Sequence, residues 1–521
     1  MSFRLSRHPE VPGLLVADLP DLAATEHLAG LLAPWLSVGD VVALSGDLGA
    51  GKTAFARALL RVLAQDPALE VPSPSFSLMI PYDLPRGRVV HADLYRVEDP
   101  DELDEVGWDE LTDDAILIVE WPERAGPRMA ADRLSVELSL APDLADALGP
   151  DARRAYLMGA GDFAVRLQRL RAAELLIDAA GFGAAERRYM QGDASSRSYA
   201  RLVLPDRSAV LMNAPRRPDG PPVRRGLPYS RLAHLAEDVS SFVAMARGLR
   251  DAGFCAPEIY AADLERGLLV TEDFGDDGVV EGVPPAPIKD RYEAAVEVLA
   301  ALHSQKLPTV LPVAPGIAHA LPVYDVEAFL IEVELMLDWY LPARNVPLDQ
   351  VVRDEFILLW RNALGPVLSE PQTWILRDYH SPNLIWLKER TGTDRVGLID
   401  FQDAVLGPAA YDVVSLTQDA RVDVSEGLEL ALLGHYVKLR RDADPTFDAR
   451  AFAHIYALMG AQRATKILGI FARLNQRDGK PQYLRHLPRV RRYLARCLGH
   501  QELGSLRAWY EAVLPSRDFS T

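Results

Sequence analysis

Residues 46–53 read GDLGAGKT, which matches the pattern G-x-x-x-x-G-K-[ST] of a phosphate-binding loop. In such a loop, Lys52 reaches the β- and γ-phosphates of a nucleotide, and the Thr53 hydroxyl binds Mg²⁺. Three glycines let backbone N–H groups close around the phosphate oxygens: Gly46, Gly49 and Gly51. These residues therefore predict a site for ATP and magnesium.

The segments on either side of this loop are those that a phosphate site needs. Residues 41–45 are an apolar run of strand length, and residues 54–63 have a helical pattern. A strand, a glycine turn and a helix bring the positive end of the helix dipole to the phosphates. Lys52 is also the only lysine in the first 288 residues. In a segment whose other basic residues are arginine or histidine, this indicates a position at which a compact positive charge is needed.

Further polar side chains follow on two predicted strands. A strand-like alternation predicts that His91, Asp93 and Tyr95 share one face. Residues 115–119 are an apolar run typical of a buried strand, and Glu120 follows at its end. Because that end lies at the ligand edge of the sheet in such folds, Glu120 is predicted to hold Mg²⁺ or to activate a water.

Two loop segments of the first third allow two interpretations each. Residues 71–76 contain two prolines, which exclude a helix and predict an extended loop with two serine hydroxyls. This is either an ordinary polar loop or a switch-like segment that faces the nucleotide. Residues 98–114 hold ten acidic and no basic side chains, which indicates either a solvated face or a docking surface for a basic partner.

A second reaction centre is predicted in the last third. Residues 376–386 read LRDYHSPNLIW, and residues 396–403 read VGLIDFQD. An Asp with an Asn five residues later, followed by a strand that ends in a second Asp, is typical of kinases. Asp378 is predicted to accept the proton of the substrate hydroxyl, and Asn383 and Asp400 are predicted to hold Mg²⁺ against the ATP phosphates.

The nucleotide lobe of this second centre lacks an expected residue. Two alternating segments, 198–204 and 208–212, predict a β-hairpin. Kinases carry a phosphate-binding lysine on the second of these strands, but no lysine occurs between residues 161 and 288. Either this lobe is inactive or other groups hold the phosphates. We predict the second, with Ser196 and Arg197 of the preceding serine-rich turn as the replacement.

Length and composition limit the remaining possibilities. A chain of 521 residues exceeds one ordinary core, and the predicted domains are 1–160 and 161–521. The net charge of −18 argues against unaided binding of nucleic acid. Cys255 and Cys497 lack metal-ligand spacing and are predicted to be reduced thiols. No apolar run reaches membrane-spanning length, so we expect a cytoplasmic protein without a membrane partner.

The motifs of the first third occur together in one known family. Over residues 10–158 the sequence resembles the small ATPase subunit family of the tRNA threonylcarbamoyladenosine machinery (TsaE). The resemblance is carried by GDLGAGKT at 46–53, SPSF at 73–76, HADLYR at 91–96 and VEWP at 119–122.

That resemblance implies an α/β P-loop ATPase that acts with two partner subunits. The partners modify the adenosine next to the anticodon, so tRNA would be contacted only indirectly. The family also implies that Thr53 and Glu120 lie at Mg²⁺, that Asp93 acts in hydrolysis and that Trp121 lies beside the nucleotide. The alternative for this domain is a P-loop kinase of a small metabolite.

The rest of the chain resembles a second family. Residues 162–515 are similar to the aminoglycoside phosphotransferase/choline kinase group, and within it to the amino-sugar anomeric kinases of peptidoglycan recycling (AmgK). The matching stretches are DASSRSY at 193–199, LPVYDVEAFLIEVELMLDWYL at 321–341, RDYHSPNLIWL at 377–387 and GLIDFQDAVLGPAAYDVVSL at 397–416.

This second resemblance implies an α+β bilobal, protein-kinase-like fold. It also implies phosphorylation of the C1 hydroxyl of N-acetylmuramate or N-acetylglucosamine by ATP. The alternatives are a choline, homoserine or aminoglycoside kinase, or a non-catalytic pseudokinase attached to the ATPase. Four acids are either binders of sugar hydroxyl or amide groups or ordinary helix-face charges: Asp325, Glu332, Glu334 and Asp403.

Overall fold

The computed structural model describes residues 5–144, 149, 151–190, 197–216, 219–368 and 372–514. The chain divides into two compact units. The first comprises residues 1–215 and 260–271, and the second comprises residues 216–259 and 272–521. The division into domains 1–160 and 161–521 stays a prediction, and the first unit continues past residue 160.

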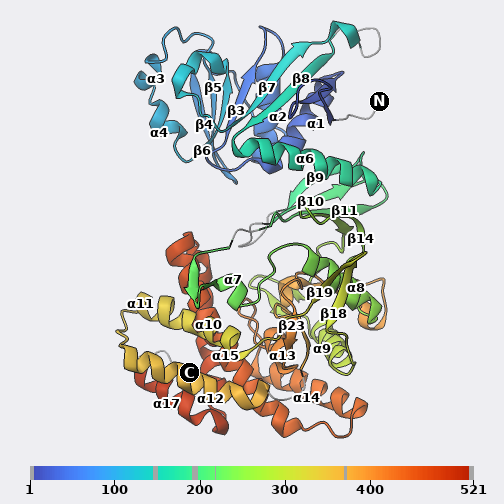
Figure 1. Cartoon of the computed structure of the whole chain (residues 1–521), viewed down its shortest axis with the longest axis vertical. Coiled ribbons are helices and arrows are strands. Elements are labelled where there is room, and N and C mark those ends of the chain that lie inside the picture. The colour runs from blue at the N-terminus through green and yellow to red at the C-terminus, as the bar shows by residue number, and fades with distance from the viewer. Residues whose placement is uncertain are drawn as a thin grey trace. The chain divides into compact units, whose positions relative to one another are not determined.

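The first unit opens with a mixed sheet of eight strands in the order β1-β2-β8-β7-β3-β6-β5-β4 (Figure 1). Its centre is parallel, because β3 pairs in parallel with both β6 and β7, and β5 pairs in parallel with β6. Its strands are β1 Leu5–Arg7, β2 Leu15–Leu19, β3 Val41–Ser45, β4 Met79–Leu84, β5 Gly87–Asp93, β6 Ala115–Glu120, β7 Arg133–Leu140 and β8 Arg153–Ala160.

Helices cover this sheet, and one of them begins at the end of the predicted phosphate-binding loop. Helix α1 (Leu22–Leu32) begins where the Asp21 side chain accepts a hydrogen bond from the Ala24 N–H. Helix α2 (Lys52–Ala64) follows β3, and both helices pack into one apolar core with β3 and β6. Two short helices, α3 (Glu102–Glu105) and α4 (Trp108–Thr112), lie in the acidic segment, where Arg128 pairs with Asp104 at 2.7 Å.

Helix α6 (Asp162–Ala179) belongs to two cores of the first unit. Phe163, Leu167 and Leu170 are buried in the core of the eight-stranded sheet. Farther along the same helix, Ala173 and Ile177 are buried in the core of a five-stranded sheet. Figure 1 shows α6 lying between the two sheets. One helix therefore joins both sheets through continuous apolar packing.

The five-stranded sheet has the order β14-β15-β11-β10-β9. The predicted hairpin is present, because β10 and β11 pair antiparallel and are joined by a turn in which Leu204 N–H donates to the Arg207 carbonyl. The strands are β9 Glu186–Met190, β10 Ser198–Val203, β11 Ser208–Asn213, β14 Ile259–Asp263 and β15 Leu268–Glu272.

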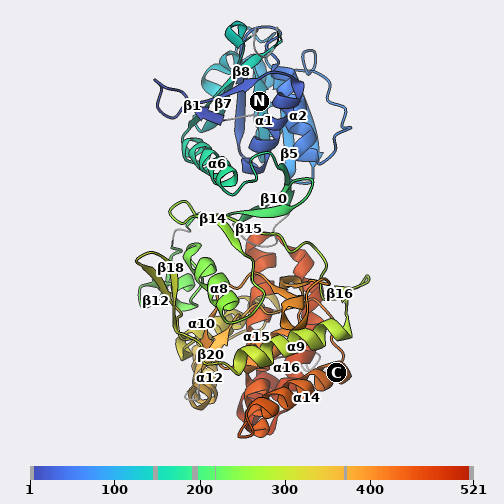
Figure 2. The ribbon, with the colours of Figure 1, turned by 90° about the vertical axis from the view of Figure 1, so that its right-hand side faces the viewer.

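The second unit is mostly helical, and α15 passes through its middle, against α10, α13 and α16 (Figure 2). Two short antiparallel strand pairs, β20–β23 and β21–β22, interrupt the helices. The helices are α7 Tyr229–Leu232, α8 Ser240–Asp251, α9 Lys289–His303, α10 Val326–Leu335, α11 Leu341–Ala343, α12 Gln350–Leu368, α13 Ala410–Thr417, α14 Glu426–Ala443, α15 Ala449–Asp478, α16 Leu487–Leu498 and α17 Gly504–Val513.

The strands of the second unit are all short, and the pairs β20–β23 and β21–β22 place the predicted kinase residues near their ends. They are β12 Pro222–Arg224, β13 Leu227–Pro228, β16 Val280–Glu281, β17 Ala286–Pro287, β18 Val310–Ala314, β19 Ile317–Ala320, β20 Thr373–Ile375, β21 Leu384–Trp386, β22 Val396–Leu398 and β23 Val405–Gly407. Cys255 and Cys497 are buried free thiols, as predicted. Over the described residues, no helix has the length and apolarity needed to cross a membrane.

Candidate functional site

The predicted phosphate-binding loop connects β3 to α2. Gly46 has a φ of +130°, and a Cβ atom there would lie 2.1 Å from the Leu138 carbonyl oxygen. Gly51 has a φ of +106° and caps the start of α2, so the first N–H groups of the helix point into the loop. This geometry provides the unpaired N–H donors and the positive dipole end that bind phosphate.

Lys52 is held inside the loop. Its Nζ donates to the carbonyls of Gly46 at 2.6 Å and Asp47 at 2.9 Å. The Nζ also lies 3.7 Å from the centre of the Trp121 ring, a cation–π contact. Burial lowers the pKa of Lys52, against the opposing effect of Glu120 and other acids. Trp121, predicted to lie beside the nucleotide, is thus placed over the phosphate-binding lysine.

Glu120, at the end of β6, lies between two partners. Its Oε2 accepts a hydrogen bond from Thr53 Oγ1 at 2.8 Å, and its Oε1 lies 2.9 Å from His91 Nε2. The His91 side chain is 0% exposed and that of Glu120 is 3% exposed, so water does not compete for this contact. A hydroxyl and a carboxylate are hard oxygen donors, so Thr53 and Glu120 fit Mg²⁺.

Asp93 is joined to the proline-containing loop. Ser75 Oγ donates to Asp93 Oδ2 at 2.7 Å, and Ser73 Oγ lies 2.7 Å from Ser75 Oγ. Asp93 pairs with Glu120 in the register of β5 and β6, so both acids lie at the same sheet edge. The serine loop therefore contacts an acid of the predicted hydrolysis site and is more than a remote polar turn.

The predicted common strand face of His91, Asp93 and Tyr95 is wrong for its last member. Strand β5 ends at Asp93, whose Oδ1 accepts a hydrogen bond from the Tyr95 N–H at 3.1 Å and turns the chain. Tyr95 is 48% exposed, and its ring centre lies 5.2 Å from that of Trp121. Tyr95 therefore supports the ring that covers Lys52 instead of extending the strand.

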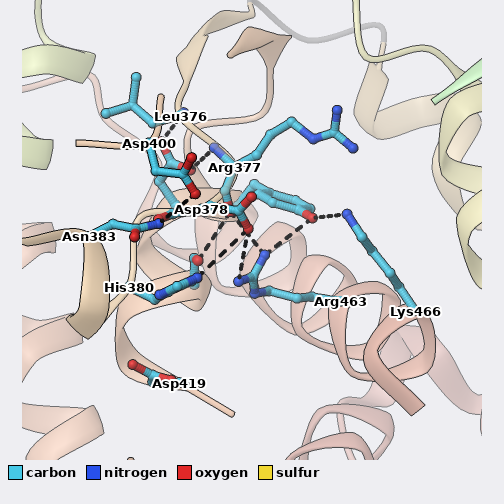
Figure 3. Close-up of polar contacts among 12 residues, drawn as sticks. Leu376, Arg377, Asp378, His380, Asn383, Asp400, Asp419, Arg463 and Lys466 are labelled. Atoms are coloured by element: carbon cyan, nitrogen blue, oxygen red, sulfur yellow. Dashed lines mark hydrogen bonds and ion pairs between the residues drawn. The ribbon is translucent and has the colours of Figure 1, made fainter. Parts of the chain in front are cut away.

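The predicted kinase residues come together in the second unit (Figure 3). Asn383 Nδ2 donates to the Asp378 carbonyl at 2.9 Å and to Asp400 Oδ2 at 3.4 Å. Asp400 has a φ of +59°, an uncommon conformation for a residue other than glycine. Asn383 and Asp400 offer amide and carboxylate oxygens side by side, a donor set that fits Mg²⁺.

Asp378 faces several cations, and its side chain is 40% exposed. Arg463 Nη2 lies 3.8 Å and His380 Nε2 lies 3.9 Å from Asp378 Oδ1. Desolvation opposes ionisation, but His380, Arg463, Lys466 and Arg377 together lower the pKa of Asp378 to about 2. Since burial lowers the pKa of His380 itself to about 4, the Arg and Lys side chains keep Asp378 ionised at neutral pH.

Two buried acids that the sequence reasoning missed hold the loop of Asp378 in place. Asp412 accepts hydrogen bonds from the N–H groups of Leu376 at 2.6 Å and Arg377 at 2.9 Å. Burial raises the pKa of Asp412 to about 7 despite these bonds. Asp419 accepts from Ser381 Oγ at 2.5 Å. The sequence offered a signal for Asp412 only, because this acid lies within the apolar run AYDVVSL of α13, where an unpaired charge would be costly.

The four acids considered for sugar binding are all engaged within the protein. Asp325 caps α10 by accepting from the Ala328 N–H, and Asp403 accepts from the Ala236 N–H at 2.6 Å. Glu334 binds Arg353 at 2.9 Å, and Glu332, which is fully buried, binds Lys466 at 2.8 Å and also Arg377. Glu332 is committed inside the protein by its burial, and a sugar-binding role for Asp325, Glu334 and Asp403 stays a prediction.

The predicted nucleotide contacts of the kinase lobe are only partly described. Ser196 lies outside the described residues, and Arg197 directly precedes β10. Ala209 and Leu211 of β11 are buried in the core that contains α6. Asn213, at the end of β11, donates to Ser198 Oγ at 3.2 Å and accepts from Arg169.

Comparisons with known proteins follow the same division. The model of the phosphotransferase enzyme family matches residues 186–452, about half of the chain, and that of the threonylcarbamoyl adenosine biosynthesis protein TsaE matches residues 19–145. An N-acetylmuramate/N-acetylglucosamine kinase of Caulobacter vibrioides is 38% identical over 361 residues, which are 67% of this chain and 97% of the relative.

Two further relatives cover the two parts of the chain. A kinase of the same description from Pseudomonas aeruginosa is 35% identical over 328 residues, 61% of this chain and 86% of the relative. A tRNA threonylcarbamoyladenosine biosynthesis protein TsaE of Rickettsia prowazekii is 36% identical over 99 residues, 19% of this chain and 68% of the relative. Each part of the chain thus has relatives of a different kind.

Proposed function

The chain belongs to the phosphotransferase enzyme family and carries a TsaE domain ahead of it, and from this premise we propose a bifunctional enzyme. Its N-terminal domain hydrolyses ATP in the threonylcarbamoyladenosine modification of tRNA. Its C-terminal domain transfers phosphate from ATP to the anomeric hydroxyl of N-acetylmuramate or N-acetylglucosamine. The cytoplasm is the compartment in which tRNA and ATP are both present, and we place the chain there.

The observation that carries the ATPase proposal is Glu120 between Thr53 and His91, next to the loop of Lys52. Thr53 and Glu120 would hold Mg²⁺, which neutralises phosphate charge when it is bound. Lys52 gives up the carbonyls of Gly46 and Asp47 and binds the phosphates instead. Asp93 orients the attacking water. Two partner subunits use this hydrolysis, and tRNA contacts them and not this acidic chain.

The observation that carries the kinase proposal is the arrangement of Asp378, Asn383 and Asp400. Asn383 and Asp400 would hold Mg²⁺, which would supply positive charge to neutralise the ATP phosphates. Asp378 is ionised at neutral pH and accepts the proton of the sugar hydroxyl as that oxygen attacks the γ-phosphate. Phosphoryl transfer depends mainly on positioning and charge neutralisation, which these three side chains supply.

Two substitutions separate the activities. Lys52→Ala is expected to abolish ATP hydrolysis by the N-terminal domain and to leave sugar phosphorylation intact. Asp378→Ala is expected to do the opposite. If either substitution removed both activities, the assignment of one reaction to each domain would be wrong.

Substrate tests distinguish the proposed reactions from their alternatives. ATP hydrolysis that rises when the two partner proteins are added supports the TsaE role, whereas phosphate transfer to a nucleoside or small metabolite contradicts it. ATP turnover with Mg²⁺ and N-acetylmuramate, but not with choline or kanamycin, supports the sugar kinase. No turnover with any of the three indicates a pseudokinase.

Arg197 is proposed to replace the missing phosphate-binding lysine, together with Ser196. The support is its place directly before the first residue of β10. Arg197→Ala is expected to raise the KM for ATP or to lower kcat of the sugar kinase. Unchanged kinetics would reject this role.

A further inference from the structure

Several cationic side chains lie close to Asp378, the proposed base. Three cations lie there, Arg377, Arg463 and Lys466, and their acidic neighbours are Glu332, Asp378, Asp403 and Asp419. Asp412 lies behind the loop, where two backbone N–H groups occupy its oxygens. A catalytic base gains no strength from surrounding cations, because they lower its pKa. A cation beside this base that a ligand can reach therefore points to an anionic group on the acceptor.

Two of these three cations, Arg463 and Lys466, come from one face of α15. Arg463 and Lys466 are three positions apart, so they lie on the same side of the helix about one turn from each other. Arg473 follows seven positions after Lys466, close to the same face, and its guanidinium lies 5.4 Å from the centre of the Tyr229 ring. Arg463, Lys466 and Arg473, which we call the α15 cation row, thus extend away from Asp378.

The cation row lies on the acceptor side of the reaction centre. In Figure 3, Asn383 and Asp400 lie on one side of Asp378, and Arg463 and Lys466 lie on the other. The proposed metal and phosphates occupy the first side, because Asn383 and Asp400 are their ligands. A sugar whose hydroxyl meets Asp378 then extends its other substituents toward α15.

Lys466 has the capacity to bind such a substituent. Its Nζ contacts Glu332 at 2.8 Å and the Tyr411 hydroxyl at 3.4 Å, two partners for a group with three N–H donors. Its side chain is 12% exposed, whereas those of Arg377 and Glu332 are 3% and 0% exposed. Of Lys466, Arg377 and Glu332, Lys466 is therefore the residue that a ligand can reach. When it binds a ligand, Glu332 keeps Arg377 as an ion-pair partner.

We propose that Lys466, flanked by Arg463 and Arg473, binds a carboxylate on the acceptor sugar, which is the lactyl carboxylate when the acceptor is N-acetylmuramate. This inference rests on the proposed sugar-kinase function and deepens it. It predicts that the enzyme prefers the acidic sugar to N-acetylglucosamine, which has no carboxylate. A charge-assisted hydrogen bond in a partly buried site corresponds to roughly a tenfold to hundredfold difference in kcat/KM.

The test compares two sugars in the full chain. The measured quantity is the kcat/KM for N-acetylmuramate divided by that for N-acetylglucosamine. Lys466→Gln is expected to lower this ratio at least tenfold, and Lys466→Arg is expected to preserve most of it. Lys438→Gln, at an exposed position of α14, is the matched control and should leave the ratio unchanged. An unchanged ratio in Lys466→Gln overturns the proposal.

A substrate-side experiment keeps the proposal testable if Lys466→Gln does not fold. The unsubstituted protein is assayed with N-acetylmuramate and with its methyl ester, which keeps the size of the arm but removes the charge. The ester is expected to have at least tenfold lower kcat/KM, and equal values overturn the proposal. A protein that phosphorylates neither sugar contradicts the proposed kinase function itself, which is a different outcome.

Discussion

Arg166 and Asp40 form a two-point ion pair that ties α6 to the start of β3. Arg166 Nη1 donates to Asp40 Oδ2 at 2.6 Å, and Nη2 donates to Oδ1 at 2.7 Å. The side chains are 29% and 10% exposed, so solvent screens the pair only in part. The pair lies between the residues of α6 that enter the first core, and β3 leads directly into the phosphate-binding loop.

We predict that this pair stabilises the first unit. Arg166→Gln or Asp40→Asn should each lower the free energy of unfolding by about 1.5–3 kcal/mol, as expected for a hydrogen bond between charged groups. The double variant should lose less than the sum of the two, because both single changes remove the same interaction. Denaturant unfolding followed by tryptophan fluorescence measures the three losses, and additive losses would show that the two residues are not coupled.

Cutting the chain at the predicted boundary should expose apolar surface. A segment of residues 161–521 keeps all of α6 but loses the core that buries Phe163, Leu167 and Leu170. Exposing each of these side chains to water removes about 1.5–3 kcal/mol of stabilising free energy. We expect this segment to self-associate in size-exclusion chromatography and to become monomeric when the three residues are replaced by Gln, Lys and Glu. A monomeric unsubstituted segment would contradict the two-core role of α6.

Glu120→Gln should lower ATP hydrolysis by the N-terminal domain at least a hundredfold. The amide loses the charge that binds Mg²⁺ and leaves buried His91 with a weaker partner. Sugar phosphorylation should stay at the level of the unsubstituted protein, since Glu120 belongs to the first unit and Asp378 to the second. Steady-state assays of both reactions test this, with Glu137→Gln on the exposed side of β7 as the control. Retained hydrolysis would remove Glu120 from the mechanism.

Trp121 should report nucleotide binding by its fluorescence. Its ring lies over Lys52, and the lysine must leave the carbonyls of Gly46 and Asp47 to bind phosphate. Adding ATP with Mg²⁺ should therefore change the emission of the intact chain, and Trp121→Phe should remove most of that change. The same titration with Lys52→Ala controls for binding elsewhere. A signal that persists in Trp121→Phe would place the responsive tryptophan at another position.

The pH dependence of the kinase should reflect the low pKa of Asp378. Its folded pKa of about 2 is below the ordinary value of 3.8, so its ionisation contributes stability above that value, and the contribution is lost as the pH falls through 2. Between pH 4 and 8, loss of activity should not come from Asp378. Arg463→Gln removes a neighbouring cation and should raise this pKa. The acid limb of the pH profile of kcat/KM should therefore shift to higher pH. Arg450→Gln, exposed on the same helix, should not move it.

Short-range chemistry was predictable from the sequence. The loop of Gly46 to Thr53 and the segment from Asp378 to Asn383 are each contiguous, so the covalent chain itself brings their groups together. Asp400 follows a strand that pairs with β21, and a short hairpin connection makes such pairing predictable. Family membership followed from the same local patterns.

Long-range partners could not be predicted in this way. His91 meets Glu120 across 29 positions, and Arg377 meets Glu332 across 45. Glu332 had the residue type of a sugar binder, but burial commits it to Arg377 and Lys466. Sequence spacing does not show which acid is buried, and burial decides whether a carboxylate must be paired inside the protein.

The sequence alone thus determined two kinds of phosphate chemistry and the main helices and strands that carry the predicted site residues. These features depend on neighbours within a few residues, where bond geometry and hydrophobic period are sufficient. Only the tertiary structure decided that α6 serves two cores, that Trp121 covers Lys52 and that α15 brings Arg463 and Lys466 to Asp378. The reason is that these contacts depend on how distant segments pack, and packing is set by the shape and burial of the whole core.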